Sequence, residues 1–272
     1  MLAYAVRGAR VAGAFIWMGY REMLAYPLGL AIGQFSAVIS TIGLYFIAKL
    51  IPSTSSVGGD YYTFAMIGII CIQVMAVGLS SFTTHLDYII QQGRFESLLV
   101  EPVNWRLLPF GLAAWPMLLN SITAALMAGT ALVLGADIRV SGIPLSLVVL
   151  LLGIAAGHAV GILAASVKVI AKRGDPIIGL YSLATGLLTG SAFPVQLLPL
   201  PLRVLSYCLP PTYVISAVRR LLMPNGDQLS GPTALQAVLL LIGFLVVMYP
   251  LALWLYGRSL EFGRKMGLLA GY

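Results

Sequence analysis

Six long apolar runs, separated by short polar segments, constrain this chain more than any other feature. An apolar run of about 20 residues is long enough to cross a bilayer as a helix. Inside hydrocarbon every backbone N–H and C=O group has to be paired, so continuous runs predict helices rather than open strands. The predicted spans are 27–50, 61–84, 107–134, 143–167, 176–193 and 232–256. The sequence therefore predicts an all-α polytopic membrane protein with six transmembrane helices in a single domain, 1–272.

Composition agrees with this class and excludes a nucleic-acid-binding domain. Sixty per cent of the residues are hydrophobic and only 9% are charged, which is outside the range of soluble globular chains. The net charge of +7 comes from small basic clusters beside the apolar runs. Nucleic-acid binders instead gather their basic residues on one face. We expect a lipid bilayer as the surroundings, and no nucleic-acid partner.

The basic clusters predict the orientation of the chain. Loops on the cytosolic side of a membrane carry the excess of Lys and Arg. With six spans and a cytosolic N-terminus, eleven basic residues are cytosolic: Arg7, Arg10, Arg21, Arg94, Arg106, Lys168, Lys172, Arg173, Arg258, Arg264 and Lys265. Five lie outside: Lys49, Arg139, Arg203, Arg219 and Arg220. We therefore expect a multi-pass protein of the inner (plasma) membrane with both termini, including the tail 258–272, in the cytosol.

The segment 1–26 precedes the first span and predicts an interfacial helix. Arg7, Arg10, Trp17 and Arg21 fall on one helical stripe, and few other polar residues accompany them. Arginine side chains reach lipid headgroups from such a position, and tryptophan favours the polar boundary. This basic, aromatic-rich start lacks a cleavage site of small residues, so no cleavable signal peptide is expected.

The segment 85–108, here called the coupling segment, is the mixed-charge stretch of the first half. Apolar side chains such as Tyr88 and Phe95 alternate with Asp87, Arg94 and Glu96. This mixture is typical of short amphipathic helices that dock on a soluble partner. Gly93 is expected to divide the segment into two helices, and Pro102 to end the second. A solvated loop is the alternative.

The segment 194–224, here called the outer hairpin, is apolar but cannot form one long helix. Proline interrupts helices because it lacks an N–H and clashes with the preceding turn. The expected breaks, which we assign to an outer gate, are Pro194, Pro199, Pro201, Pro210 and Pro211. Two short helices that dip into the outer leaflet would reconcile these prolines with the many leucines. We expect them to pack on spans five and six, with Arg203, Arg219 and Arg220 reaching the headgroups or one another's partners. A static plug is the alternative to a moving lid.

Small residues predict close helix contacts in several spans. Gly153, Gly157 and Gly161 recur every four residues and predict a ridge on which another helix packs closely. Gly29 with Gly33, and Gly186 with Gly190, form shorter patterns of the same kind. His158 lies beside the ridge, where a packed neutral imidazole is the alternative to a role in proton coupling.

The two cysteines give no disulfide or metal pattern. Cys71 lies within a span and Cys208 within the outer hairpin. Buried thiols are the expectation, and a bond between the two stays open.

Motifs for catalysis and nucleotide binding are missing from the sequence. There is no phosphate loop, since no glycine is followed directly by lysine, and His85 and His158 lie on different segments. We expect this chain to be no enzyme and to bind no cofactor. The spans also lack carboxylate pairs and internal repeats, which disfavours secondary transport.

Two blocks of the sequence are similar to ABC-2 type permeases, the membrane subunits of ATP-driven exporters. The first is the pattern G-x-hydrophobic-acid-x-L-L-x-x-P after the second span, formed by Gly93, Phe95, Glu96, Leu98, Leu99 and Pro102. The second is SAFPVQLLPLPLRVLSYCLPPTYVISAVRRLL, residues 191–222, between spans five and six. Glu101 departs from the pattern, because many members have threonine before the proline.

The resemblance implies a function without catalysis in this chain. The six residues of the first block, together with Arg94, would contact an ABC ATPase subunit that is present in two copies and binds the ATP and Mg²⁺. A second permease copy or a homologous permease would complete the transporter. The alternative is a membrane scaffold or channel-like protein without ATP coupling. An importer permease is disfavoured because its cytosolic E-A-A-x-x-x-G pattern is absent.

The substrate is left open by the sequence. The polar groups within the spans are uncharged, which mildly favours an apolar or amphipathic cargo. These candidate groups are Gln34, Ser40, Thr41, Gln73, Ser182, Thr185 and Thr189.

Overall fold

Helices form the regular structure of the part of the chain that a computed structural model describes. This part comprises residues 13–21, 23, 24, 27–51, 60–91, 107–171, 175–226, 229 and 231–265, and no strand occurs within it. The longer helices are α2 (Pro27–Lys49), α3 (Tyr61–Gln91), α5 (Leu108–Val133), α6 (Ile143–Ala171), α7 (Asp175–Leu188) and α10 (Ala234–Lys265). The all-α prediction is confirmed for the described residues.

Five of these helices are long and apolar enough to cross a membrane: α2, α3, α5, α6 and α10. The segment predicted as span five gives α7, which has 14 residues. At 1.5 Å per residue α7 is about 21 Å long, less than the roughly 30 Å of a bilayer core. The structure therefore supports a multi-pass protein, while the sixth span stays a prediction.

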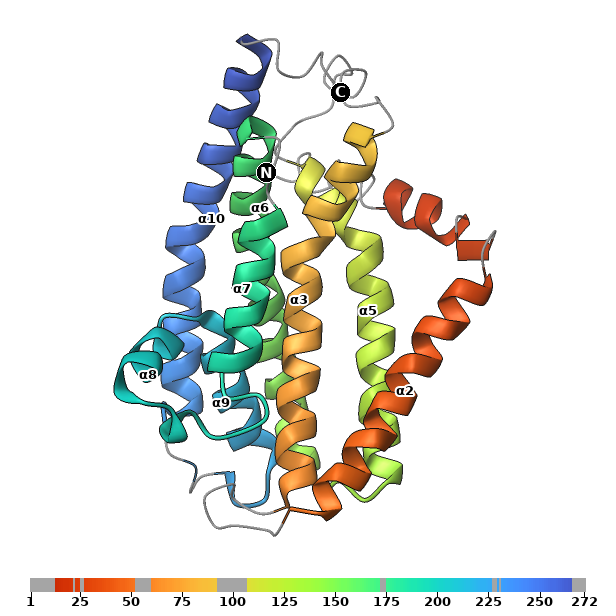
Figure 1. Ribbon diagram of the computed structural model, residues 1–272, viewed down its shortest axis with the longest axis vertical. Coiled ribbons are helices and arrows are strands. Elements are labelled where there is room, and N and C mark those ends of the chain that lie inside the picture. Colours follow the sequence, from red (N-terminus) through yellow and green to blue (C-terminus); the bar gives the residue numbers. More distant parts are fainter. Residues whose placement is uncertain are drawn as a thin grey trace.

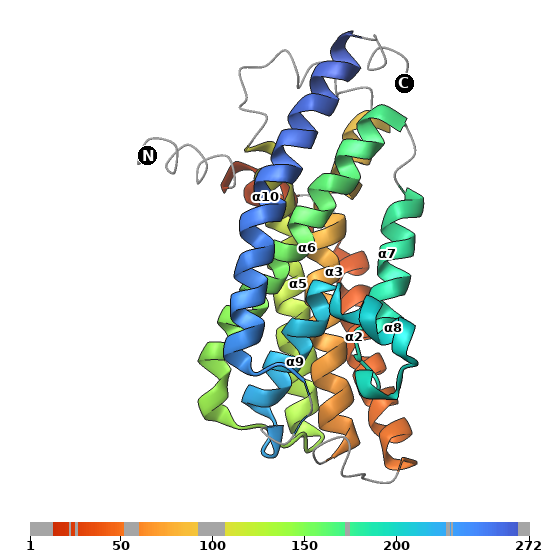
Figure 2. The ribbon, with the colours of Figure 1, turned by 90° about the vertical axis from the view of Figure 1, so that its left-hand side faces the viewer.

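The helices form an elongated bundle in which α3 and α6 are central (Figures 1 and 2). α3 packs on α6 and α5, and α6 packs on α10. At the upper end of Figure 1, α3, α6 and α10 finish while α5 and α7 begin; at the lower end α3, α6 and α10 begin. The bundle thus has two distinct ends, called upper and lower below.

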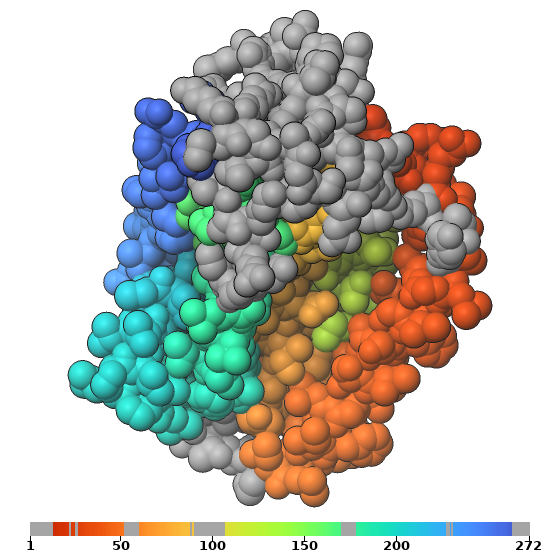
Figure 3. Space-filling model, turned by 45° about the horizontal axis from the view of Figure 1, so that its top comes forward, coloured from red at the N-terminus to blue at the C-terminus, as the bar shows by residue number. Residues whose placement is uncertain are grey.

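α2 lies at one edge of the bundle and makes few contacts with it (Figures 1 and 3). Its buried residues are Thr41 and Ala48, whereas Leu28 and Phe35 are 74% and 69% exposed. A Cβ added to either of the predicted close-packing glycines of this helix, Gly29 and Gly33, would meet nothing within 4 Å among the described residues. α2 therefore presents an apolar surface to its surroundings.

Buried side chains gather in separate clusters along the bundle. One cluster, toward the lower end, joins α3, α6, α9 and α10 through Phe64, Val149, Val214 and Leu241. Another, toward the upper end, joins α3, α5, α6 and α10 through Leu86, Leu108, Ile162 and Tyr256. A third ties α2 to α3 and α5. Because α3 contributes to all of them, it connects the two ends of the molecule.

The predicted helix ends agree closely at the lower end and differ at the upper end. α3 continues to Gln91, seven residues beyond the predicted end at 84, and α10 continues to Lys265 rather than 256. The first part of the coupling segment is therefore a continuation of α3 and not a separate helix. A helix satisfies its own backbone, so it can extend past an apolar run without a change of structure.

The outer hairpin consists of short helices, as the prolines predict. They are the 3₁₀ helix η3 (Val195–Leu197), α8 (Leu200–Tyr207) and α9 (Pro210–Leu222). Pro194 and Pro199 precede η3 and α8, while Pro201, Pro210 and Pro211 lie in first turns. Proline is tolerated in a first turn because its missing N–H has no intrahelical partner there. The five prolines thus begin helices instead of merely breaking them.

The interfacial segment predicted for 1–26 is described over part of its length. Residues 13–21 are helical, and Trp17 is exposed. Gly19 packs against the ring of Trp115 in α5. The remaining residues of this segment, apart from 23 and 24, lie outside the described residues.

Candidate functional site

The predicted ATPase-coupling residues lie outside the described residues, so the structure places the helices that flank them. These residues are Gly93, Arg94, Phe95, Glu96, Leu98, Leu99 and Pro102. α3 ends before them at Gln91, and α5 begins after them at Leu108. Leu86 and Leu108 are both buried against α6 and α10 in the upper cluster. Both ends of the coupling segment are therefore fixed to the core of the bundle.

An ion pair ties the end of α3 to the end of α6. Lys168 donates a hydrogen bond to a carboxylate oxygen of Asp87. Lys168 is only 6% exposed, and a buried lysine is tolerated when it is paired. The two residues belong to separate segments that the sequence predicts to be cytosolic, and their contact was not predicted.

The glycine ridge of α6 allows α3 to pack at close range, as predicted. A Cβ on Gly157 would lie 2.6 Å from the carbonyl oxygen of Met75, and one on Gly161 would lie 2.4 Å from that of Leu79. Gly78 makes the reciprocal approach to α6. No side chain larger than hydrogen fits at such distances, so α3 and α6 are held as a closely packed pair.

Gly153, the first glycine of the ridge, lies closest to a side chain of the outer hairpin. A Cβ on Gly153 would lie 2.9 Å from Cγ2 of Val214 in α9 and 3.3 Å from Met75. Met75 is near the midpoint of α3, whereas the C-terminal end of α9 lies near Phe64. α9 therefore runs from the middle of the bundle to its lower end (Figure 2).

The hairpin packs on more of the bundle than predicted. α8 contacts α7, and α9 contacts α10, which agrees with packing on spans five and six. α9 also contacts α3 and α6. Its buried face includes Pro210, Pro211, Val214 and Val218. One half of the hairpin is therefore part of the protein core.

Arg219 of α9 points into the bundle, so the prediction that it reaches lipid headgroups is wrong. It is 5% exposed. Its Nε and Nη2 atoms donate to the carbonyl oxygen of Phe64 at 3.1 and 2.9 Å. Nη1 donates to Gly190 at 2.6 Å, and Nη2 donates to Ser191 at 2.5 Å. The guanidinium also lies 3.4 Å from the centre of the Phe64 ring.

These contacts join three chain segments at one side chain. A guanidinium carries five N–H donors in a planar fork, which suits several carbonyl oxygens at once. Gly190 has a positive φ of 76°, which turns the chain after α7. Gly68 leaves room for the carbonyl of Ser191, since a Cβ there would lie 2.1 Å from it. Arg219 thus fixes the end of α7, the start of α3 and α9 to one another.

The neighbouring arginines also bind backbone carbonyl oxygens, while their predicted headgroup contacts stay a prediction. Arg203 donates to Gln196 and Leu198. Arg220 donates to Leu229 and Gly231, just before α10. The backbone around the hairpin, which lacks regular helical pairing, is satisfied in this way.

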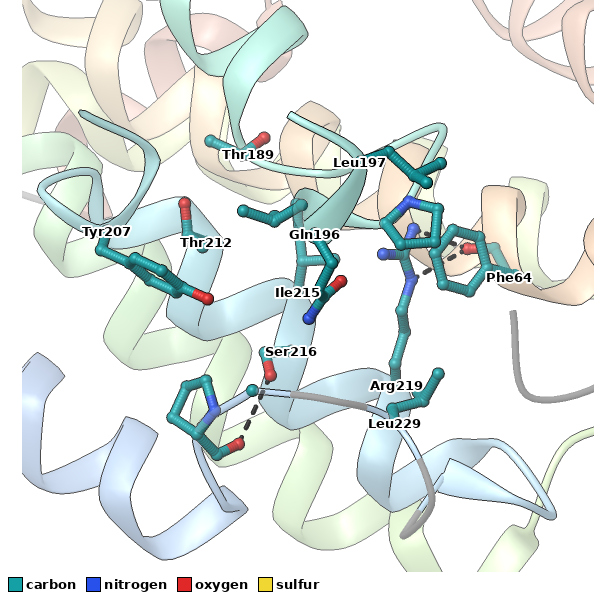
Figure 4. A pocket seen from close by; sticks show the side chains of 14 residues that line it. Phe64, Thr189, Gln196, Leu197, Tyr207, Thr212, Ile215, Ser216, Arg219 and Leu229 are labelled. Carbon is teal, nitrogen blue, oxygen red and sulfur yellow. Dashed lines mark hydrogen bonds between the residues drawn. The ribbon is translucent and has the colours of Figure 1, made fainter. Parts of the chain in front are cut away.

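A cavity of about 150 Å³ lies between the hairpin and the start of α10 (Figure 4). Its polar lining comes from Thr189, Gln196, Tyr207, Thr212, Ser216 and Arg219. Ile215 and Leu229 form part of its apolar wall. Of the predicted gate prolines, Pro194 lines this cavity. The cavity therefore has both charged and apolar character.

His158 is packed among aromatic rings inside the bundle. Its ring centre is 5.3 Å from that of Phe110 and 6.3 Å from that of Tyr249. Phe110 and Tyr249 stack on each other at 6.0 Å. Neither neighbour is a carboxylate, and His158 packs against both rings; a role in proton coupling stays open.

Most of the predicted pathway hydroxyls bond within their own helices. Carbonyl oxygens three or four residues earlier accept hydrogen bonds from Ser40, Thr41, Thr185 and Thr189. Gln73 is exposed on α3. Its backbone carbonyl oxygen accepts a hydrogen bond from the Asn120 side chain of α5 at 3.3 Å. These four hydroxyl groups therefore have structural partners, and Gln73 is an exposed polar group at the middle of α3.

The structure also places the two cysteines and the glycines predicted to pack closely in span five. Cys71 is buried and Cys208 is exposed, and both thiols are free. Gly186, like Gly29 and Gly33, has no close neighbour among the described residues, so close helix packing at Gly186 stays a prediction. Gly190 instead serves a turn.

Arg219 was not predicted as an interior residue, although the sequence carries one signal for it. Residues 176–226 contain three arginines and no acidic residue. A cation in an apolar, helix-breaking segment without acids has to find carbonyl oxygens, water or a ligand.

Comparison with known proteins agrees with this architecture. The model of the ABC-2 type transporter family matches residues 13–223, which is most of the chain and includes both blocks quoted above. A search of curated proteins found no match. The chain belongs to the ABC-2 type transporter family and is a multi-pass membrane permease component of an ABC transporter.

Proposed function

We propose that this chain is the permease subunit of an ATP-driven exporter. It works with two copies of a separate ABC ATPase, which bind ATP and Mg²⁺, and with a second permease copy or a homologous permease. This chain itself binds no cofactor. It lies in the inner (plasma) membrane with six spans and both termini in the cytosol.

The observation that carries this proposal is the continuity of α3 between two fixed points. α3 has 31 residues and is about 46 Å long at 1.5 Å per residue. Near one end Asp87 pairs with Lys168, and near the other end the Phe64 carbonyl is held by Arg219. A displacement at the coupling segment is therefore transmitted to the hairpin without an intervening loop.

In the proposed mechanism, closure of the ATPase subunits pushes on Gly93, Arg94, Phe95, Glu96, Leu98, Leu99 and Pro102. Because α3 and α6 pack backbone to backbone at Gly157 and Gly161, they move as one unit. α9 is seated on that unit through Val214 and Gly153. The outer hairpin, with its gate prolines, then moves relative to the edge helix α2 and opens the path outward.

The apolar face of α2 supports assembly with a second permease copy. Its exposed side chains include Leu28, Ile32, Phe35, Ile39 and Phe46. Lipid tails would cover this face in a monomer, and a partner helix would cover it in a dimer. The cytosolic E-A-A-x-x-x-G pattern of importer permeases is absent, which favours export.

Copurification and ATP hydrolysis test the proposal. The tagged chain, isolated from its own membranes in lipid nanodiscs, is expected to bring an ATPase with it. Glu96→Ala and Arg94→Ala should lower that ATPase recovery or its hydrolysis rate by roughly tenfold, because a charge-assisted contact at a small interface is worth about 1.5–3 kcal/mol. Glu261→Ala, an exposed acid near the upper end of α10, is the matched control.

The outcomes separate the exporter from the alternative. A scaffold or channel-like protein would be isolated without an ATPase, and the coupling variants would behave as the wild type. Loss of hydrolysis in Glu96→Ala with normal membrane insertion and normal behaviour of Glu261→Ala supports the exporter.

A further inference from the structure

The cavity beside Arg219 has the features of a ligand site that the transport mechanism above does not use. It has a volume of about 150 Å³ and is lined by an amide, hydroxyl groups and a guanidinium together with apolar side chains. In Figure 4 the Gln196 amide and the Ser216 hydroxyl lie near each other, and the Arg219 guanidinium lies beside the Phe64 ring. Binding pockets typically combine an apolar wall with a few convergent polar groups of this kind.

The charge around this cavity is positive. Arg219 lines it, and Arg203 binds the carbonyl oxygen of Gln196, which also lines it. No acidic residue occurs from 176 to 226. Backbone carbonyl dipoles hold these guanidinium groups in place without removing their formal positive charge. A negative charge placed in the cavity would therefore be stabilised over short distances in a partly dry environment.

The rim of the cavity is apolar and faces outward. Leu197 lines the cavity and is 70% exposed, and Leu200 at the start of α8 is 73% exposed. Val204 and Leu205 extend this exposed surface along α8. A molecule with its charged group in the cavity would thus lay an apolar chain over α8.

We propose that the cavity between η3, α9 and the start of α10 binds the anionic headgroup of an amphipathic, lipid-like molecule. A phosphate or carboxylate group is held in the cavity by the positive charge of Arg219 and lies beside the Gln196 amide and the Tyr207 hydroxyl. The attached chain lies against Leu197 and α8. This binding needs no ATP and is independent of the exporter mechanism.

Lipid-dependent stabilisation of the purified full-length chain tests the site. In neutral detergent, added phosphatidylglycerol is expected to raise the melting temperature by roughly 5 °C more than phosphatidylcholine does, since a ligand of the folded state stabilises it by mass action. Gln196→Glu changes one amide group to a carboxylate inside the cavity and should remove most of this difference. Gln236→Glu is the matched control, because Gln236 is exposed in the first turn of α10 and keeps a capping oxygen for Thr233.

A second variant and a second ligand make the result decisive. Ser216→Asp places a carboxylate elsewhere in the same cavity and should act as Gln196→Glu does if the latter fails to fold. Equal stabilisation by both lipids, or an unchanged preference for phosphatidylglycerol in both cavity variants, overturns the site. Inorganic phosphate that stabilises the wild type as well as phosphatidylglycerol does, and loses this effect in Gln196→Glu, would overturn the lipid assignment in favour of a free anion.

Discussion

Lys168, close to the C-terminal end of α6, is buried and forms an ion pair with Asp87 of α3, four residues before α3 ends. α3 leads directly into the coupling segment, so the pair fixes the start of that segment to the bundle. A buried ion pair that loses one partner leaves an uncompensated charge, which is more costly than the pair itself.

Neutralising Asp87 should therefore destabilise the upper end of the bundle. Asp87→Asn is expected to lower the free energy of unfolding by about 1–3 kcal/mol, less than the roughly 3–5 kcal/mol of a fully buried pair, because Asp87 is partly exposed. Thermal unfolding in detergent measures this change. The exchanged pair Asp87→Lys with Lys168→Asp should recover part of the loss. Lys49→Met, which removes an exposed cation, is the control. Equal destabilisation by Asp87→Asn and Lys49→Met would contradict a special role for the pair.

Close packing of α3 on α6 predicts a large effect of one added methyl group. A Cβ at Gly157 would meet the backbone of Met75 at 2.6 Å, so Gly157→Ala has to displace a helix and should cost about 1–3 kcal/mol. Gly186→Ala meets nothing within 4 Å among the described residues and should be neutral or slightly stabilising through its helix propensity. The difference in melting temperature between the two variants checks this. Equal values would show that the two helices separate easily.

The Arg219 contacts predict that charge alone cannot replace the guanidinium. Arg219→Leu leaves the carbonyl oxygens of Phe64, Gly190 and Ser191 without these donors and should cost about 2–4 kcal/mol. Arg219→Lys keeps the charge but has a compact ammonium group, so it should recover only part of this loss. Arg258→Leu, on an exposed residue of α10, is the control. Full stability of Arg219→Lys, measured by chemical denaturation, would argue against the planar fork.

The six-span topology predicts which described surface residues face the outside. In a cysteine-free background, Asp137→Cys at the lower end should react with a membrane-impermeant maleimide in intact cells. Glu261→Cys at the upper end should react only after permeabilisation. Both positions are exposed. Labelling of position 261 in intact cells would exclude the proposed orientation.

Length and periodicity of the apolar runs were sufficient to predict the helices. The predicted and observed starts of α2, α3 and α6 coincide at 27, 61 and 143. Each helix start could be predicted from the residues around it, because a run of apolar residues stabilises its own helix in a membrane whatever its neighbours are. The prolines of the outer hairpin likewise act within their own turns, so two short helices could be predicted there.

Upper helix ends were less predictable for a related reason. The polar residues after 84 mark where the apolar run ends, but α3 continues through them to Gln91. Hydrophobicity shows where a bilayer would end, whereas a helix ends only where its hydrogen bonding ends.

The tertiary structure alone decided which side chains meet. Arg219 and Phe64 are 155 positions apart, and Lys168 and Asp87 are 81 apart. Their pairing depends on which helices are neighbours and at what register, and that is set by the packing of the whole bundle. For the same reason the glycine ridge was predictable as a close contact, but not that Gly153 would receive Val214 while Gly157 received α3. Local chemistry in the sequence determined the helices and their breaks, and contacts between distant segments determined what those helices hold together.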